Sequence, residues 1–284
     1  MTEKPLDRRI NAYRDDIADI GLKNKIRAKE FVSAEKYQVA RGLVPLYGKA
    51  DETSQQTSQL LYGEYFNVFE LSGNWAWGQT LKDDYVGYCP LSDLTPDLLT
   101  TTHYVSALSS HIYLEPDIKS RPVDIVHMMS EVTVIDEKQT NGFMPLADGN
   151  WIYATHIAKD FGTDPVSEAL KFLYTPYLWG GRSNAGIDCS GLIQIAYASI
   201  GVNVPRDADL QEKFIGTPLK EDQITGHGDI AFFPGHVGIM LDDMHLLHAN
   251  AHHMRVSIDP LKEVIDIVSL QTDKPPLSCI KRVS

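Results

Sequence analysis

Short strands divided by polar turns are the feature of this chain that most limits its fold. Between residues 30 and 94, five short segments are rich in aromatic and β-branched residues, and turn-forming residues such as Ser72–Asn74 lie between them. Strands of this length at such close spacing are typical of a small barrel. The sequence therefore predicts a β-barrel over residues 30–96.

A weaker copy of this pattern follows the first barrel. Three later segments echo three strands of the first set in the same order, at residues 131–136, 142–146 and 150–154. Such self-similarity is typical of a repeated structural unit, although a shared β composition produces the same echo. We predict a second small barrel at residues 101–158.

The charged segment at residues 1–29 precedes both barrels. Its apolar residues Ile10, Tyr13 and Ile17 lie three and four positions apart, so we predict one or two short helices that form a strap on another domain. The segment lacks the apolar run of a signal peptide. Nowhere in the chain do about 18 apolar residues follow one another, as a membrane-spanning helix requires. These features predict a cytoplasmic protein without a membrane partner.

The pattern changes after the second barrel, where helices come first. Residues 165–174 have helical spacing and begin with a proline, and the apolar run after Cys189 predicts a second helix that ends at Gly201. Antiparallel strands are expected next, at residues 229–233, 236–241 and 245–249. Helices followed by such strands form an α+β arrangement. We therefore predict a third domain at residues 160–284.

Charge and cysteine content exclude several classes of function. The chain has a net charge of −12 and no stripe of Lys and Arg, which argues against binding to nucleic acid or to an anionic membrane. Its three cysteines stand far apart, without the spacing of a disulfide framework or a zinc site. The histidines at 245–253 lack partners at ligand spacing. We expect no metal, no cofactor and no obligate protein partner.

Cys189 is the candidate nucleophile. It stands where a loop becomes a helix, and the positive end of the helix dipole favours the reactive thiolate. A free cysteine is more commonly a small buried core residue. The glycines on both sides and the polar neighbours Asp188 and Ser190 argue against that alternative here.

A thiolate nucleophile requires a base, and two histidines on the predicted hairpin are candidates. His236 opens one strand and His248 lies in the next. An odd number of residues in the connecting loop places both on one face as direct or diagonal neighbours, whereas a two-residue loop places them on opposite faces. Either histidine alone has a simpler structural interpretation. Together with Cys189 they predict a catalytic site.

Four segments of this region resemble the NlpC-type cysteine peptidases, papain-like enzymes that cut bacterial cell-wall peptides. The segments are Tyr177–Gly181, Gly186–Leu192, Gly228–Ile230 with His236–Ile239, and His248–Ala249. The preceding barrels resemble the bacterial SH3 domains of the subgroup that acts as γ-D-glutamyl-L-diamino-acid endopeptidases. The resemblance implies an α+β protein in which a papain-like domain follows two SH3-like barrels and the helical strap.

The resemblance also implies a role for each matched residue. Cys189 would be the nucleophile, and His236 would act first as general base and then as general acid. His248 would orient His236. The Tyr177 hydroxyl and the backbone N–H of Cys189 would form the oxyanion hole. Tyr177 also has a structural interpretation, as an amphipathic tyrosine at a helix–turn junction.

Carboxylates would select the substrate, because a buried α-amino group needs a negative partner. Asp207 matches the amine-binding acid of the subgroup, and Asp188 beside the nucleophile is a second candidate. The subgroup often has serine after this acid, whereas this chain has Ala208. Glu64 and Tyr85 resemble the acid and the tyrosine that close the far end of the cleft. Their structural alternatives are a solvated strand-edge carboxylate and a barrel-core aromatic.

These features predict a cysteine endopeptidase that hydrolyses the γ-D-Glu–diamino-acid bond of murein peptides with a free N-terminal L-Ala. The diamino acid would be diaminopimelate or lysine. The barrels would close one end of the cleft, so that the enzyme acts on stem peptides already freed from glycan, in cell-wall recycling. Two alternatives are a papain-like amidase or acyltransferase, and a cell-wall-binding protein with an inactive catalytic domain.

Overall fold

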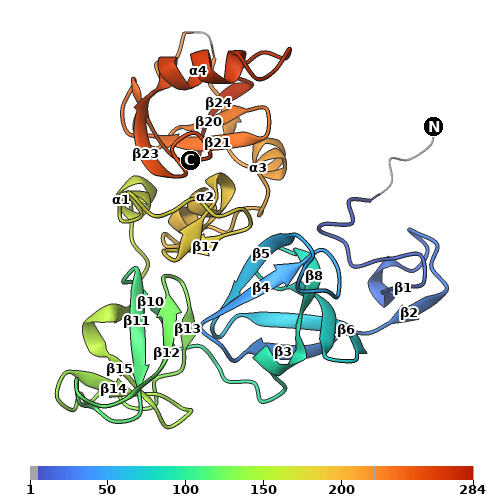
Figure 1. Ribbon diagram of the computed structural model, residues 1–284, viewed down its shortest axis with the longest axis vertical. Helices are drawn as coiled ribbons and strands as arrows, with labels where there is room; N and C mark the ends of the chain where they lie inside the picture. Colours follow the sequence, from blue (N-terminus) through green and yellow to red (C-terminus); the bar gives the residue numbers. More distant parts are fainter. Residues whose placement is uncertain (1–5, 221, 284) are drawn as a thin grey trace. The chain divides into compact units, whose positions relative to one another are not determined.

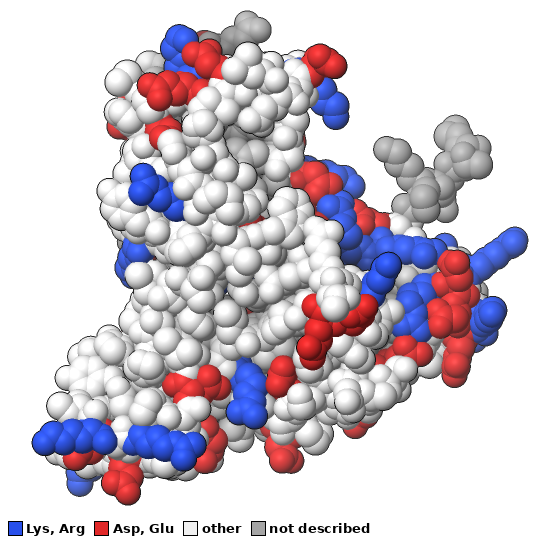
Figure 2. All heavy atoms as spheres, viewed as in Figure 1, with Lys and Arg blue, Asp and Glu red and all other residues white. Residues whose placement is uncertain are grey.

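The computed structural model describes residues 6–220 and 222–283, and the chain divides between Lys159 and Asp160 into two compact units (Figure 1). Among these residues, every helix is too short or too polar to span a bilayer. On the face drawn in Figure 2, Lys and Arg side chains lie beside Asp and Glu and form no continuous basic stripe.

The segment before the first barrel does not form the predicted helical strap within its described residues, 6–29. Strand β1 (Ile17–Asp19) pairs in parallel with β2 (Glu30–Val32), and a single 3-10 turn, η1 (Ile20–Leu22), follows β1. Ile17 packs against Phe69 and Trp77, whereas its neighbour Ala18 packs in a separate cluster. Neighbouring residues that face opposite sides have the geometry of an extended chain. The helix prediction was wrong because this segment buries apolar residues on two sides.

The first β assembly is a single antiparallel sheet of seven strands in the order β5-β4-β8-β7-β6-β3-β9. Its strands are β3 (Glu35–Val39), β4 (Leu43–Tyr47), β5 (Gln56–Leu61), β6 (Tyr65–Ser72), β7 (Trp75–Thr80), β8 (Val86–Pro90) and, after the turn η2 (Leu91–Asp93), β9 (Leu94–Thr95). Alternate residues of each strand face one core, as Val44 and Leu46 do. Cys89 lies fully buried in this core.

The second β assembly of the same unit has its own core, built around Ile112, Val126 and Ile152. Three strands form one sheet: β13 (Glu131–Val132), β10 (His103–Val105) and β16 (Ile157–Ala158). Four strands form another: β12 (Pro122–His127), β11 (Ser109–Tyr113), β15 (Trp151–Tyr153) and β14 (Phe143–Pro145), with the turn η3 (Ala154–His156) after β15. The first unit therefore contains two separate β cores.

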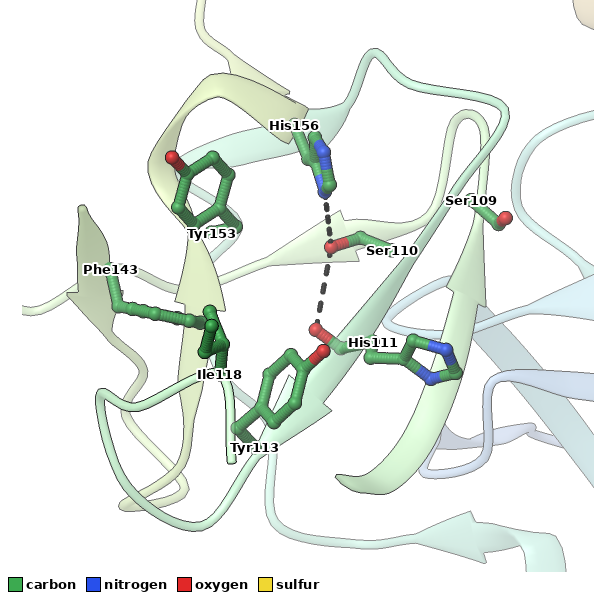
Figure 3. A pocket seen from close by; sticks show the side chains of 8 residues that line it. All are labelled: Ser109, Ser110, His111, Tyr113, Ile118, Phe143, Tyr153 and His156. Atoms are coloured by element: carbon green, nitrogen blue, oxygen red, sulfur yellow. Dashed lines mark hydrogen bonds between the residues drawn. The ribbon is translucent and has the colours of Figure 1, made fainter. Parts of the chain in front are cut away.

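An aromatic-lined pocket of about 280 Å³ lies on the second β assembly (Figure 3). Tyr113, Phe143 and Tyr153 contact one another edge to face, with ring centroids 5.4 and 5.2 Å apart. His156 extends this row, and its Nδ1 lies 2.9 Å from the Ser110 hydroxyl. None of the residues predicted for catalysis lines this pocket.

The second unit is an α+β structure around a six-stranded antiparallel sheet in the order β19-β24-β20-β21-β22-β23. The strands are β19 (Thr217–Pro218), β20 (Ile230–Phe233), β21 (His236–Met240), β22 (His245–Asn250), β23 (Arg255–Pro260) and β24 (Cys279–Arg282). The helices are α1 (Pro165–Leu170), α2 (Cys189–Ala198), α3 (Ala208–Phe214) and α4 (Leu261–Ser269), and the small hairpin β17 (Arg182–Ser183) and β18 (Gly186–Ile187) precedes α2.

The sheet of the second unit lies between α2 and α4 (Figure 1). Val264 of α4 packs with Phe233 and Met240. Helix α2 is buried from Cys189 to Tyr197 and contacts β21 and β22. Cys189 is the first residue of α2, so this packing holds the candidate nucleophile beside the hairpin that carries the two histidines.

Candidate active site

The N-terminus of α2 is fixed by Asp188. Its carboxylate accepts hydrogen bonds from the backbone N–H of Gly191 at 2.7 Å and of Gly180 at 2.8 Å. The buried Arg206 guanidinium donates to both oxygens of the same carboxylate, at 2.9 and 2.6 Å. A carboxylate offers about four lone-pair sites, and these contacts occupy them. Asp188 therefore caps the helix and pairs with Arg206, and its contact with a substrate amine stays a prediction.

Glycines allow the backbone to close tightly around this helix start. A Cβ atom on Gly191 would lie 2.3 Å from the carbonyl oxygen of Gly181. A Cβ atom on Gly181 would in turn lie 2.4 Å from the carbonyl oxygen of Gly186. These glycines, which flank Cys189 in the sequence, serve the close approach of the loop to the helix.

The hairpin of β21 and β22 brings the two histidines together. Met240 pairs with Leu246, so five residues connect them, which is the odd-numbered alternative. This register places His236 and His248 on one face as diagonal neighbours. His236 Nε2 lies 2.7 Å from His248 Nδ1. Gly238 leaves this face open, since a Cβ atom there would lie 3.0 Å from the His248 Cβ.

Asp259 of β23 is a member of this cluster that the sequence analysis missed. His248 Nε2 lies 2.9 Å from its Oδ2 atom, and the Ser257 hydroxyl donates to the same oxygen at 2.6 Å. Asp259 belongs to none of the motif segments. The signal that could have found it is the alternation of β23, which puts Ser257 and Asp259 on one face of the strand.

Four of the predicted residues meet in one cleft of about 570 Å³, which is lined by Tyr177, Cys189, His236 and His248. Asp259 lines the same cleft, and α4 supplies another part of the wall through Val264, Ile267 and Val268. Tyr177 is half-buried, and its backbone N–H donates to the carbonyl of Met254 at 2.9 Å. Burial raises the pKa of the Tyr177 hydroxyl, so this group is a proton donor at neutral pH.

Four further predicted residues are described within their own units. Asp207 is the half-buried N-cap of α3 and Ala208 is the first residue of that helix, and neither lines this cleft. Glu64 and Tyr85 belong to the first unit, where both are buried. Glu64 accepts the backbone N–H of Leu61 at 3.0 Å, and Tyr85 lies among the residues of the first core. Contact of these four residues with a substrate stays a prediction.

Desolvation shifts the pKa of both candidate reacting groups towards their neutral forms. It raises the pKa of the Cys189 thiol to about 12, against the opposing effect of the Ser190 and Val237 backbone N–H groups. Burial and the neighbouring His248 lower the pKa of His236 to about 3. At this helix start, desolvation has a larger effect on the thiol pKa than the two backbone N–H groups, so the shift opposes the one that the helix position favours.

The lowered pKa of the half-buried His236 predicts a loss of stability in acid. The pKa of His236 is about 3 in the folded chain, whereas the ordinary pKa of histidine is about 6.5. At pH values between these two, the unfolded chain binds a proton on His236 that the folded chain excludes. The stability present above pH 6.5 should therefore fall towards pH 3, by about 1.4 kcal/mol per pH unit. Urea unfolding at pH 7, 6 and 5, with pulsed hydrogen exchange of β21 peptides, measures this slope. His236→Gln should reduce the slope, and an identical slope in both proteins would contradict the assignment.

Comparisons with known proteins agree with this arrangement. Residues 174–267 match the NlpC/P60 family, and residues 46–94 match the bacterial dipeptidyl-peptidase SH3 domain. A solved NlpC/P60 family protein from Bacillus cereus has the same fold, with a TM-score of 0.72 at 18% identity over 87% of this chain and 99% of that one.

Two relatives are similar over most of their length. Dipeptidyl-peptidase 6 of Lysinibacillus sphaericus is 32% identical over 244 residues, which cover 77% of this chain and 89% of that protein. A gamma-D-glutamyl-L-lysine dipeptidyl-peptidase of Bacillus cereus is 25% identical over 235 residues, which cover 72% of this chain and 70% of that protein. The resemblance inferred from the motifs is confirmed. The chain belongs to the NlpC/P60 family of cell-wall peptidases and carries a bacterial SH3 domain ahead of its peptidase domain.

Proposed function

We propose that this chain is a cysteine endopeptidase that hydrolyses the γ-D-Glu–diamino-acid bond of stem peptides with a free N-terminal L-Ala. The observation that carries the proposal is the cleft that Cys189 and Tyr177 share with the hydrogen-bonded pair His236 and His248. The names of the relatives, a dipeptidyl-peptidase and a gamma-D-glutamyl-L-lysine dipeptidyl-peptidase, support this substrate class.

The first step is proton transfer from Cys189 to His236. Nε2 of His236 is held by His248 at 2.7 Å, so Nδ1 is the nitrogen that remains for the thiol. Because desolvation favours the neutral form of both groups, the thiolate forms in this step, beside the backbone N–H groups of Ser190 and Val237 that lower the thiol pKa.

The thiolate then attacks the γ-carbonyl carbon of D-Glu. The carbonyl oxygen becomes an oxyanion that accepts hydrogen bonds from the Tyr177 hydroxyl and the Cys189 backbone N–H. His236, now an imidazolium, gives its proton to the amine of the diamino acid, which leaves. Water, with His236 again as base, hydrolyses the thioester, releases L-Ala-γ-D-Glu and returns the proton to Cys189.

Substrate selection is assigned to carboxylates outside the reacting centre. Asp207 would pair with the α-amino group of L-Ala, because a buried cation needs an opposite charge. Ala208 leaves this position without the hydroxyl common in the subgroup. Glu64 and Tyr85 would close the far end of the cleft. On this proposal residues 30–96 and 101–158 form two SH3-like domains, and residues 160–284 form the peptidase domain. The enzyme recycles freed peptides in the cytoplasm.

The test compares three substrates under identical conditions. L-Ala-γ-D-Glu-diaminopimelate should be cleaved to L-Ala-γ-D-Glu at least about 100-fold faster than its N-acetylated form, since acetylation removes the charge that Asp207 would pair with. Intact sacculi should release no dipeptide. Mass spectrometry of the products measures all three reactions. Equal cleavage of both peptides would refute the requirement for a free terminus, and release of a muramoyl sugar would favour the amidase.

A further inference from the structure

The hydrogen-bonded chain that begins at His236 continues beyond His248 to Asp259 on β23. His236 Nε2 and His248 Nδ1 are 2.7 Å apart, and His248 Nε2 and Asp259 Oδ2 are 2.9 Å apart. The register of β22 and β23 pairs Leu246 with Asp259 and His248 with Ser257. Asp259 and His248 are therefore diagonal neighbours on one face of the sheet.

The Asp259 carboxylate fixes the position of each proton in this series of hydrogen bonds. An ionised carboxylate only accepts hydrogen bonds, so His248 carries its proton on Nε2. Its Nδ1 is then an acceptor, and the proton shared with His236 must lie on His236 Nε2. The lone pair of His236 is consequently on Nδ1, where the Cys189 proton has to arrive. The Asn250 amide nitrogen, 3.3 Å from His248 Nε2, favours the opposite tautomer, so the charge at Asp259, at 2.9 Å, is what selects this one.

Buried polar groups hold Asp259 in place. The Ser257 hydroxyl donates to Asp259 Oδ2 at 2.6 Å and accepts from the Asn250 amide at 2.8 Å. The orientation of the Asn250 amide is set in turn by the His253 backbone N–H, which donates to its oxygen at 2.8 Å. Burial raises the pKa of Asp259, but hydrogen bonds from Ser257 and His248 outweigh it and lower that pKa overall, so the group is a carboxylate at neutral pH.

One further histidine, His253, lies beside Asp259, and His252 lies against it. His253 Nε2 is 3.3 Å from Asp259 Oδ1, from the turn between β22 and β23. His252 contacts the His253 ring at 4.7 Å between centroids. Both line the cleft, and protonation of His253 would add positive charge beside the carboxylate.

We propose that Asp259 is a positioning residue of the peptidase, which acts through His248. It holds His236 in the tautomer that presents Nδ1 to Cys189, and its negative charge stabilises the imidazolium that forms when the thiol loses its proton. The inference rests on the proposed roles of Cys189 and His236.

Asp259→Asn tests this proposal, because the amide keeps the shape and removes the charge. Its NH₂ group can donate to His248 Nε2, which reverses both tautomers and leaves a proton on His236 Nδ1. We expect kcat to fall by about 100- to 10,000-fold, in line with the loss of an orienting carboxylate in other nucleophile–histidine sites, while KM for the tripeptide stays within about twofold. Asp259→Glu, which keeps the charge, should recover part of the loss.

A second measurement does not depend on the peptide substrate. Alkylation of Cys189 by iodoacetamide, followed by mass spectrometry of its peptide, reports how the rate rises with pH. In Asp259→Asn this profile should move to higher pH, since His236 can no longer take the proton. Asp242→Asn is the matched control, because Asp242 lies 2.9 Å from His245 Nδ1 at an exposed site and should change neither readout.

The outcomes separate this inference from the proposed function. Unchanged kcat and an unchanged alkylation profile in Asp259→Asn would overturn the positioning role while leaving the peptidase proposal intact. A shifted profile in a protein whose wild type cleaves no tripeptide would support the positioning role and refute the function. If Asp259→Asn loses its native circular dichroism, Ser257→Ala decides instead. This substitution removes one hydrogen bond to Asp259, and we expect kcat to fall by about tenfold. An unchanged kcat would overturn the inference.

Discussion

Cys189→Ala is expected to lower kcat for the tripeptide by at least about 10⁴-fold, because it removes the atom that forms the acyl-enzyme. The oxyanion donors remain in this variant, so the residual rate should still exceed that of the uncatalysed reaction. Quenched-flow or long-incubation assays with mass spectrometric detection of L-Ala-γ-D-Glu measure the loss. Calorimetric titration should show that the variant still binds the tripeptide.

Cys279→Ala provides the control for this experiment. Cys279 is a partly buried thiol on β24 that lies 3.8 Å from a Glu212 carboxylate oxygen. It lines no part of the cleft, so its loss should leave kcat within about twofold of the wild type. If Cys189→Ala kept a tenth or more of the wild-type rate, thiolate chemistry at this residue would be excluded.

The residues of the cleft could be predicted where the chemistry depends on a local pattern. Cys189 at the start of a helix is such a case, since one segment of sequence carries the glycines, the N-cap and the helix. The pairing of His236 with His248 was predicted only as one of two alternatives. Whether the two histidines share a face depends on the number of residues between the paired positions. The pairing of Met240 with Leu246 determines that number.

Contacts between distant segments could not be predicted in the same way. Asp188 beside the nucleophile resembles a substrate-binding acid in sequence, but its partner Arg206 lies 18 residues away. Asp259 was missed for a similar reason, because its contact with His248 arises from the pairing of β22 with β23. In the N-terminal segment, helical spacing was misleading because the apolar residues there pack into two separate clusters.

Arg206→Met is expected to destabilise the peptidase unit by about 3–5 kcal/mol, the usual result of removing one partner from a buried ion pair. Arg206 is 1% exposed, and its guanidinium donates to both oxygens of Asp188 and to the Ser190 hydroxyl. Its loss leaves the Asp188 charge buried at the helix start. Urea unfolding with pulsed hydrogen exchange of α2 peptides measures the free energy of unfolding of this unit.

Lys262→Met is the matched control within the same unit. It breaks an exposed pair in which Lys262 Nζ lies 2.7 Å from Asp266, and it should cost less than about 1 kcal/mol. Arg206→Met combined with Asp188→Asn should be less destabilising than Arg206→Met alone, because the double variant leaves no unpaired charge. A loss below 1 kcal/mol in Arg206→Met would mean that Asp188 finds another partner or solvent there.

Arg206→Met should also lower kcat where the unit stays folded, since Asp188 caps the helix whose first residue is Cys189. A stable variant with full activity would show that the cap does not position the nucleophile.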